Sequence, residues 1–360
     1  MSDLLRVAIL GTGLPHSAEG RTGFGMSRAH VPGYIQSGRC EIVALSDLIE
    51  ERMARFNHEL CGGKAALYTD YEALLANEKP DMVSIATWPH LHCEMVVAAA
   101  EVGVRAIHCE KPMAGTFGEA KRMAAVCAER GVQLTFNHQR RHLPTFQSAR
   151  TLIQDGVIGA LTRLEGSCPN MLDWGTHWLN VFQMLNGEAA PAWVLGQVDS
   201  RRPHQVYGVV HDTEGVCLVG YENGVHSLLC TGETAEKAVG CSIKAFGTEG
   251  MIEIHNAPPY LRVRGKGDTH LRELDGPSTE GGLHGNFANA LNVIDAVGCL
   301  EAGTTPLCDV SNALATTEII YACYESARRR GRIDLPLTIE DHPLQSMINQ
   351  GVFPAAVKVD

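Results

Sequence analysis

The 360-residue sequence predicts an α/β protein with two domains. Over about the first 140 residues, short apolar strand-like runs alternate with segments of helical periodicity. After that point the strands become longer and alternate polar with apolar residues. At this length, two domains can each bury a core. We therefore expect residues 1–140 to form a doubly wound parallel sheet and residues 141–340 a second α/β domain, with a tail over 341–360.

The strand-like runs of the first part are apolar throughout, which predicts a sheet covered on both faces. Strand–helix alternation gives right-handed crossovers and hence parallel strands. The expected strands are 6–10, 41–45, 82–86, 105–109 and 132–136. The expected helices are 49–60, 71–75, 92–102 and 117–130, with another beginning near Gly25 or Met26.

In the second part, alternating strands and a hairpin turn at 222–224 predict a large, mostly antiparallel open sheet with one exposed face. Two helices are expected near the end of the chain, over 287–300 and 312–330. This pattern completes an α/β architecture in which a parallel sheet precedes an antiparallel one.

The first strand runs into Gly11-Thr12-Gly13, the start of a dinucleotide-binding fingerprint. The third glycine is missing, because His16 stands in its place beside Pro15. The motif is restored if residues 14–24 are an insertion and Gly25 makes the close helix–strand contact. An ordinary glycine-rich turn is the alternative.

The spacing of Asp47 favours the nucleotide-binding interpretation. This residue lies about 20 positions after Gly25, at the end of the second strand, where an acidic side chain binds the ribose hydroxyls. A carboxylate there would repel a 2′-phosphate, so NAD is expected rather than NADP.

Two further stretches are candidates for chemistry. Glu110-Lys111-Pro112 follows an apolar strand, at the edge where doubly wound sheets bind ligands, although a surface salt bridge would give the same pattern. Asp173 and His177 are four residues apart on one helical face, which fits a proton-accepting histidine with a carboxylate partner. An N-capping aspartate followed by a helix-face histidine is equally compatible.

In order and spacing, a set of motifs resembles the Gfo/Idh/MocA family, the glucose–fructose oxidoreductase and inositol dehydrogenase-like proteins. The motifs are GTG, ALSD, TDYEALL, TWPHLH, HCEKPMA, NHQRRHLP, DWGTHWLN, AFGTEGMIEI and YESARRRGRIDLPL. Together they cover nearly the whole chain, and EKP with D-x-G-x-H is the specific combination. The resemblance implies an N-terminal Rossmann domain and a C-terminal α/β domain whose open sheet commonly forms homodimers or homotetramers.

The resemblance also implies roles for individual residues. Lys111 matches the catalytic lysine that hydrogen-bonds the reacting hydroxyl, His177 the proton-transferring histidine and Asp173 its carboxylate partner. Trp88 interrupts the segment that passes the nicotinamide. The expected cofactor-binding residues are Gly11, Thr12, Gly13, Gly25, Asp47, Thr87, Pro89, His92, Glu110 and Lys111. The expected substrate-binding residues are Lys111, His138, Arg141, Asp173, Trp174 and His177.

The implied activity is an NAD-dependent oxidoreductase that transfers hydride between nicotinamide and a secondary alcohol of a sugar, an inositol-like polyol or a glycoside. Two alternatives stay open. One is an NAD-dependent glycosidase or lyase that oxidises its sugar only transiently. The other is a non-catalytic, NAD-bound sugar sensor or regulator, although the filled lysine, aspartate and histidine positions favour an enzyme.

The composition of the chain excludes several classes of binding partner. A net charge of −11 argues against nucleic acid, and no apolar run is long enough for a membrane helix. Twelve scattered cysteines without C-x-x-C pairs, and no apparent signal peptide, predict reduced thiols in the cytoplasm. The histidine pairs His90/His92 and His138/His142 lack further ligands, so no metal is expected.

Overall fold

The computed structural model of the protein describes residues 4–15, 18–19, 23–201, 204–206, 208–258, 260–274, 283 and 287–353. The chain forms two compact units. The first comprises residues 1–115, 119–139 and 286–313, and the second comprises 116–118, 140–285 and 314–360. Each unit contains its own sheet, and the predicted α/β class is confirmed.

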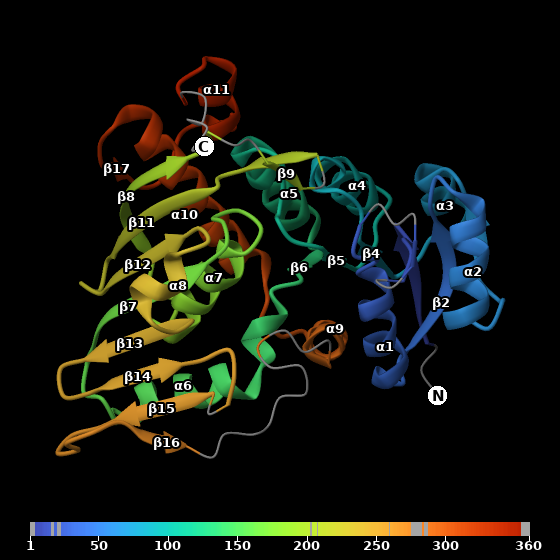
Figure 1. The fold of residues 1–360 in the computed structure, drawn as a ribbon. Helices are drawn as coiled ribbons and strands as arrows, with labels where there is room; N and C mark the ends of the chain where they lie inside the picture. The colour runs from blue at the N-terminus through green and yellow to red at the C-terminus, as the bar shows by residue number, and fades with distance from the viewer. Residues whose placement is uncertain are drawn as a thin grey trace. The chain divides into compact units, whose positions relative to one another are not determined.

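The sheet of the first unit is parallel throughout, as predicted, with strand order β3-β2-β1-β4-β5-β6. Figure 1 labels β2, β4, β5 and β6 of this sheet. The order reverses between β1 and β4, and such a reversal marks the ligand-binding end of a doubly wound sheet. The strands are β1 Leu5–Leu10, β2 Cys40–Ser46, β3 Ala66–Tyr68, β4 Met82–Ile85, β5 Ala106–Cys109 and β6 Gln133–Phe136. Only β3 was not predicted.

Helices follow the strands of this sheet, and local signals explain where two of them begin. The Asp70 side chain accepts hydrogen bonds from the amides of Glu72 and Ala73 and so caps α3. Pro89 lies in the first turn of α4, where its missing N–H costs nothing. The helices are α1 Ser27–Ser37, α2 Glu50–Leu60, α3 Tyr71–Glu78, α4 Pro89–Glu101 and α5 Phe117–Arg130.

A later helix, α9 (Phe287–Ala302), completes the core of the first unit. Val293 and Val297 of α9 are buried in one hydrophobic cluster with Val31 and Tyr34 of α1. The two helices approach closely at Gly33, where a Cβ atom would lie 2.5 Å from the Cβ of Val293. The first unit is therefore built from segments that are far apart in the sequence.

The second unit contains a nine-stranded sheet with order β16-β15-β14-β13-β7-β12-β11-β8-β17. Only β12 and β7 pair in parallel, which confirms the predicted large, mostly antiparallel sheet. Its strands are β7 Leu161–Cys168, β8 Pro191–Asp199, β11 Glu214–Tyr221, β12 His226–Thr231, β13 Ile243–Gly247, β14 Met251–Ile254, β15 Leu261–Arg264, β16 Arg272–Leu274 and β17 Ile333–Asp334. A separate two-stranded sheet pairs β9 His204–Val206 with β10 Val209–His211.

One face of the large sheet packs against α7 (Gly175–Leu185), all of whose residues are buried. Trp178 of α7 donates its indole N–H to the carbonyl of Ser242 at 2.9 Å. On the opposite face, Leu195 of β8 and Val216 of β11 are 44% and 46% exposed. The remaining helical segments are η1 Gln139–His142, α6 Pro144–Gln154, α8 Ala235–Val239, α10 Val310–Arg329 and α11 Pro343–Asn349. Helix α11 lies in the predicted tail and buries Leu344.

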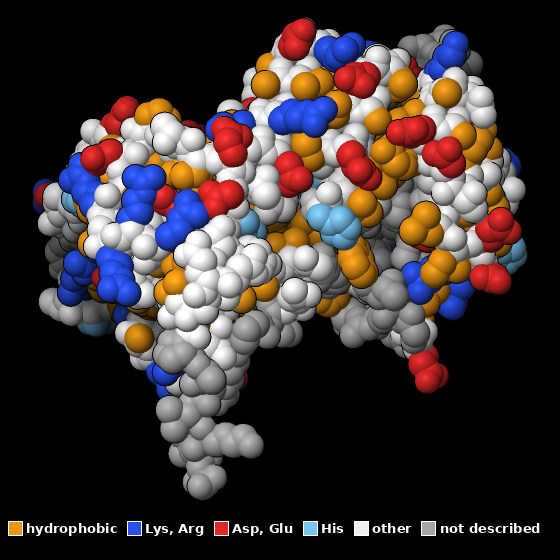
Figure 2. Space-filling view, turned by 90° about the horizontal axis from the view of Figure 1, so that it is seen from above, with side chains coloured by type: hydrophobic (Ala, Val, Ile, Leu, Met, Phe, Trp, Pro, Cys, Tyr) orange, Lys and Arg blue, Asp and Glu red, His pale blue; other side chains and the backbone are white. Residues whose placement is uncertain are grey.

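The surface carries both signs of charge. On the face drawn in Figure 2, acidic and basic side chains are interspersed with apolar ones. Within the described part of the chain, no helix combines the length and the apolar composition that a bilayer crossing requires. All twelve cysteines lie in the described ranges as thiols, outside any disulfide.

Candidate active site

Three glycines shape the turn after β1. A Cβ atom on Gly11 would lie 2.7 Å from the Ala86 carbonyl oxygen, and one on Gly13 would lie 2.8 Å from the Cα of Gly25. Gly25 itself has a φ of +61° and approaches the carbonyl of Leu14 so closely that no side chain fits. The close contact of Gly25 is therefore with the segment that follows Gly13, whereas the sequence predicted a contact between helix and strand. His16 and residues 17 and 20–22 of the expected insertion lie outside the described residues.

Asp47, directly after β2, is bonded to the glycine turn. Its Oδ2 accepts hydrogen bonds from the Thr12 amide at 2.9 Å, the Thr12 hydroxyl at 2.8 Å and the Gly13 amide at 3.2 Å. The hydroxyl of Ser27, the first residue of α1, donates to the Thr12 carbonyl at 2.9 Å. The turn, the start of α1 and the end of β2 therefore form one hydrogen-bonded group.

This group fits a dinucleotide. The three glycines allow the backbone to pack closely around the turn, and α1 begins two residues after Gly25, where its N-terminus favours an anion. A carboxylate at the end of β2 is the usual partner of ribose hydroxyls. Asp47, Thr12 and Gly13 would hold the phosphates and the adenosine ribose of a bound dinucleotide.

The lysine turn, residues 110–113, follows β5 at the same edge of the sheet. Glu110 is buried, and its Oε1 accepts hydrogen bonds from Asn137 at 2.6 Å and pairs with His30 Nε2 at 2.9 Å. Its Oε2 accepts the Lys111 amide at 3.1 Å. Burial favours the protonated acid, but His30, Lys111 and Asn137 outweigh that effect and hold the pKa of Glu110 below its usual value.

His92 of α4 contacts the other end of the lysine turn. Its Nδ1 lies 3.0 Å from the Pro112 carbonyl oxygen, and its Nε2 lies 3.2 Å from that of Thr87. Burial lowers the pKa of His92, although these backbone carbonyls and Glu110 favour the charged form. Pro89 is buried in α4 and Thr87 is half-buried, whereas Trp88 between them is 41% exposed.

In the second unit, Asp173 and His177 are both buried at the start of α7. The helix is not capped by Asp173, contrary to one interpretation of the sequence. Instead, the Asn170 side-chain oxygen accepts the amides of Asp173 at 2.9 Å and Trp174 at 3.1 Å. Asn170 therefore orders the turn that precedes α7, and the helix itself has no side-chain cap.

Asp212 anchors the segment that leads into α7. Its carboxylate accepts the Met171 amide at 2.9 Å, the Tyr324 hydroxyl at 2.7 Å and the Thr231 hydroxyl at 2.9 Å. Burial raises the pKa of Asp212 despite these three donors. No sequence pattern points to this residue, because its partners lie on separate elements.

Two adjacent arginines have different surroundings. Arg140 is buried in the second unit, with its guanidinium carbon 4.5 Å from the centre of the Trp178 ring and 5.2 Å from that of Trp174. Burial lowers the pKa of Arg140 to about 9, and Cys168 and Asp173 oppose that shift. Arg140, which the predicted set omits, is therefore the arginine beside Asp173 and Trp174.

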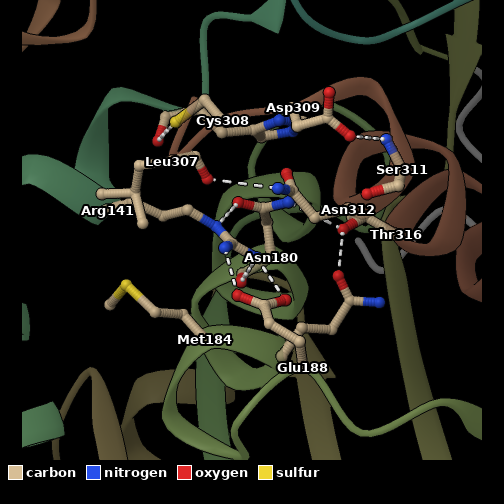
Figure 3. Close-up of polar contacts among 12 residues, drawn as sticks. Arg141, Asn180, Met184, Glu188, Leu307, Cys308, Asp309, Ser311, Asn312 and Thr316 are labelled. Carbon is tan, nitrogen blue, oxygen red and sulfur yellow. Dashed lines mark hydrogen bonds and ion pairs between the residues drawn. The ribbon is translucent and has the colours of Figure 1, made fainter. Parts of the chain in front are cut away.

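Arg141, which was expected to bind substrate, is fully engaged elsewhere in the second unit (Figure 3). Its Nη2 donates to the Asn180 carbonyl of α7 at 2.8 Å, its Nε donates to the Asn180 side chain, and the guanidinium pairs with Glu188. Asn180 in turn donates to the Thr316 hydroxyl at 3.0 Å. These contacts fit a structural role in which Arg141 holds α7 in place. His138, also in the expected substrate set, is buried in the first unit.

Comparison with known proteins agrees with this geometry. Residues 5–138 match a family model described as an oxidoreductase family with an NAD-binding Rossmann fold. The chain is 26% identical to a D-apiose dehydrogenase from Paraburkholderia graminis, covering 90% of this chain and 91% of that protein. It is also 26% identical to an NADP-dependent D-xylose 1-dehydrogenase from Haloarcula marismortui, covering 75% of this chain and 79% of that protein.

Among solved structures, a levoglucosan dehydrogenase in complex with NADH and levoglucosan matches the fold with a TM-score of 0.76. The two chains are 20% identical, and the match covers 93% of this chain and 100% of that one. Fold and glycine turn define a Rossmann-type NAD(P)-binding oxidoreductase. The match over residues 5–138 is to the Gfo/Idh/MocA family, and it confirms the resemblance read from the motifs of the chain.

Sequence reasoning missed His30 and Asn137. A histidine within a helix and an asparagine after a strand give no signal by themselves, because their partners are distant in sequence. Among the described residues, no group of three or more histidine, cysteine, aspartate or glutamate side chains is arranged to hold a metal ion.

Proposed function

We propose that this chain is an NAD-dependent dehydrogenase that oxidises a secondary alcohol of a sugar or an inositol-like polyol. The observation that carries the proposal is the lysine turn at the carboxyl edge of the sheet that also holds the glycine turn. The named activities of the relatives, which act on D-apiose and D-xylose, support a sugar substrate.

Bound NAD supplies the hydride acceptor for this reaction. The Nζ of Lys111 donates a hydrogen bond to the reacting hydroxyl and stabilises the negative charge that develops on its oxygen. His177 accepts the hydroxyl proton at an imidazole nitrogen, and Asp173 orients neighbouring hydroxyls. Trp174 and His138 stay proposed as substrate contacts. Arg141 is assigned a structural role because its donors are already used.

Asp47 is the reason for proposing NAD over NADP. A carboxylate at the end of β2 binds ribose hydroxyls and repels a 2′-phosphate. One relative is named as NADP-dependent, so cofactor preference has to be measured for this chain directly.

The experiment is a turnover assay of the full chain with D-apiose, D-xylose, levoglucosan and myo-inositol, each with NAD and with NADP. We expect reduced cofactor to form with at least one sugar, at least about tenfold faster with NAD. Lys111→Ala and His177→Ala should each lower turnover by about 10²-fold or more. NADH affinity, followed by fluorescence, should change by less than about threefold.

Lys64→Ala and His58→Ala are matched controls, because both side chains are exposed on the first unit. Wild-type turnover in both site variants would remove the catalytic assignment. NADH binding without turnover of any sugar would favour the sensor alternative. Release of a free aglycone from a glycoside without NADH formation would favour the glycosidase.

We also propose a homodimer or homotetramer formed through the exposed face of the large sheet, in a cytoplasmic setting. That face is hollowed between strands and a turn, and its lining residues are Leu195, Gly196, Gln197, Val216, Leu218, Leu228, Arg330 and Gly331. Apolar side chains on an open sheet face favour association with another protein surface. Cysteines held as thiols suit a reducing compartment.

A further inference from the structure

A buried anion lies directly before the proposed catalytic lysine. The Glu110 carboxylate is 5% exposed and contacts three groups, the His30 imidazole, the Asn137 amide and the Lys111 backbone N–H. A buried carboxylate is strongly unfavourable unless hydrogen bonds and opposite charges compensate for its lost hydration. Three polar partners around a single side chain therefore indicate that the fold maintains Glu110 as a charged group.

His30 supplies the first of these partners from α1. Its ring is completely buried, with Nδ1 3.0 Å from the Ser84 hydroxyl and Nε2 2.9 Å from Glu110 Oε1. Both ring nitrogens are thus engaged, which fixes the orientation of the imidazole. The proposed reaction gives His30 no role, and nothing in the sequence motif around it predicts one.

Asn137 supplies the second partner, and α9 holds it in place. Its amide donates to Glu110 at 2.6 Å and to the Asn289 side chain at 2.8 Å. Its own side-chain oxygen accepts a hydrogen bond from Asn292 at 3.2 Å. Asn289 and Asn292 are both buried on α9. Two helices, α1 and α9, therefore converge on Glu110.

We propose that His30 is a positioning residue for Lys111. Together with Asn137 it fixes the Glu110 carboxylate, and that carboxylate fixes the Lys111 backbone through its N–H. The direction in which the lysine side chain leaves β5 then depends on a histidine 80 residues earlier in the chain. The inference rests on the proposed function for the role of Lys111 in turnover, but the contacts themselves do not.

The helix that carries His30 is also bonded to the glycine turn. Ser27 of α1 donates to the Thr12 carbonyl one turn before His30. The same rigid element therefore contacts the expected cofactor turn at its first residue and the lysine turn through Glu110. A positional error at His30 would misplace the lysine relative to the cofactor without removing either group.

The test uses the full chain and compares His30→Leu, His30→Gln and Glu110→Gln. The first readout is competitive acetylation of Lys111 by trace acetic anhydride at mildly alkaline pH, with exposed Lys64 as the internal reference. The rate of labelling depends on how freely the reagent reaches the side-chain amine, so it reports whether the Glu110 carboxylate still fixes the lysine turn. We expect His30→Leu and Glu110→Gln to raise Lys111 labelling at least about threefold, and His30→Gln, which keeps a donor, to stay closer to wild type.

The second readout is turnover with the best sugar of the panel named above, measured beside NADH affinity. His30→Leu should lower kcat by about tenfold or more, with NADH affinity changed by less than about threefold. In a protein that already carries Glu110→Gln, His30→Leu should lower kcat little further, because both substitutions act through the same carboxylate. If His30→Leu does not fold, Asn137→Ala removes the other donor and carries the same expectation.

Asn57→Ala is the control for simple destabilisation. Asn57 is buried in the same unit, and its amide donates to the Ala65 carbonyl at 2.9 Å, away from the lysine turn. It should lower the melting temperature without raising Lys111 labelling. The proposal is overturned if His30→Leu leaves labelling unchanged, or if Asn57→Ala raises it equally. Full turnover in Lys111→Ala would remove the proposed catalytic role of Lys111, and absence of turnover with every sugar would refute the proposed function, while the labelling result would still decide the role of His30.

Discussion

At the residue scale, His342 illustrates how burial changes the pKa of a side chain. The side chain of this residue caps α11, because Nδ1 accepts the Gln345 amide at 3.4 Å. The ring stacks on Tyr324 with 5.7 Å between the centroids. Burial, helped by nearby His211, lowers the pKa of His342 to about 4. The folded protein therefore keeps this imidazole neutral.

This depressed pKa predicts a loss of stability in acid. Between about pH 6.5 and pH 4 the unfolded chain binds a proton at His342 that the folded chain does not, so unfolding becomes easier as pH falls. By pH 4 this effect lowers the free energy of unfolding by about 3 kcal/mol, because each unit of pKa difference corresponds to about 1.36 kcal/mol. His342→Asn keeps a capping oxygen without a titrating ring.

Urea unfolding of His342→Asn and wild type at a series of pH values measures the effect. The variant should have the shallower pH dependence between pH 6.5 and pH 4. Parallel dependences for the two proteins would show that His342 is not responsible.

Arg140 and Arg141 show how far the contacts of single side chains can be predicted from the sequence. Both residues follow the last strand of the first part, at the edge where ligands are expected. Sequence reasoning selected Arg141 for substrate, yet Arg140 is the one over Trp174. The two lie in the short η1 turn, where neighbouring side chains point in different directions and no periodicity assigns a face. Only the fold can decide between them.

At the scale of elements, the contact between α1 and α9 depends on a glycine within a helix. A side chain at Gly33 would clash with Val293 and with the Ala290 carbonyl. Gly298 of α9 is different, because a Cβ atom added there would have no neighbouring atom within 4 Å. Gly33 is therefore tightly packed in the contact between α1 and α9, whereas Gly298 has open space around it.

The two glycines give opposite predictions. Gly33→Ala should lower the free energy of unfolding by about 2 kcal/mol, because a well-packed helix contact has no room for a methyl group. Gly298→Ala should raise it by about 0.5–1 kcal/mol, because alanine loses less backbone freedom in a helix. Thermal and urea unfolding measure both. Equal effects of the two substitutions would contradict the close packing of α1 on α9.

Elements with strong patterns were predictable, and those defined by tertiary partners were not. Helix α1 begins at Ser27, close to the expected start near Gly25 or Met26, because the glycine spacing locates it. Strand β3 has three residues, too few for a periodic signal. Helix α9 was predicted as a helix, but its apolar face does not reveal that its partner is α1.

At the scale of the whole molecule, the exposed face of the large sheet is the basis of the proposed oligomer. The substitution Val216→Asp places a charge on this face, in the hollow between strands, where the residue is 46% exposed. Desolvating that charge in an interface is unfavourable, so association should weaken by about tenfold or more.

Light scattering of purified protein measures the mass. We expect a multiple of 38.9 kDa for the wild type and a shift toward the single-chain mass for Val216→Asp. Val102→Asp is the control, because Val102 is 51% exposed on the first unit. A wild-type mass of one chain, or an unchanged oligomer in Val216→Asp, would contradict the proposal.

The overall architecture was accessible from sequence because two periodicities differ along the chain. Apolar strands separated by helices indicated the parallel sheet, and alternating strands indicated the antiparallel one. The motif order indicated the family. The support around the lysine was not accessible, because His30, Glu110 and Asn137 meet only in the folded chain.

The return of residues 286–313 to the first unit has a consequence for synthesis of the protein. A ribosome releases Val31 and Tyr34 well before Val293 and Val297, the side chains that cover them. At roughly 5–20 residues per second, the delay between residues 139 and 286 is on the order of 10 seconds. During that interval the apolar side chains of the first unit that pack against α9 lack their partner.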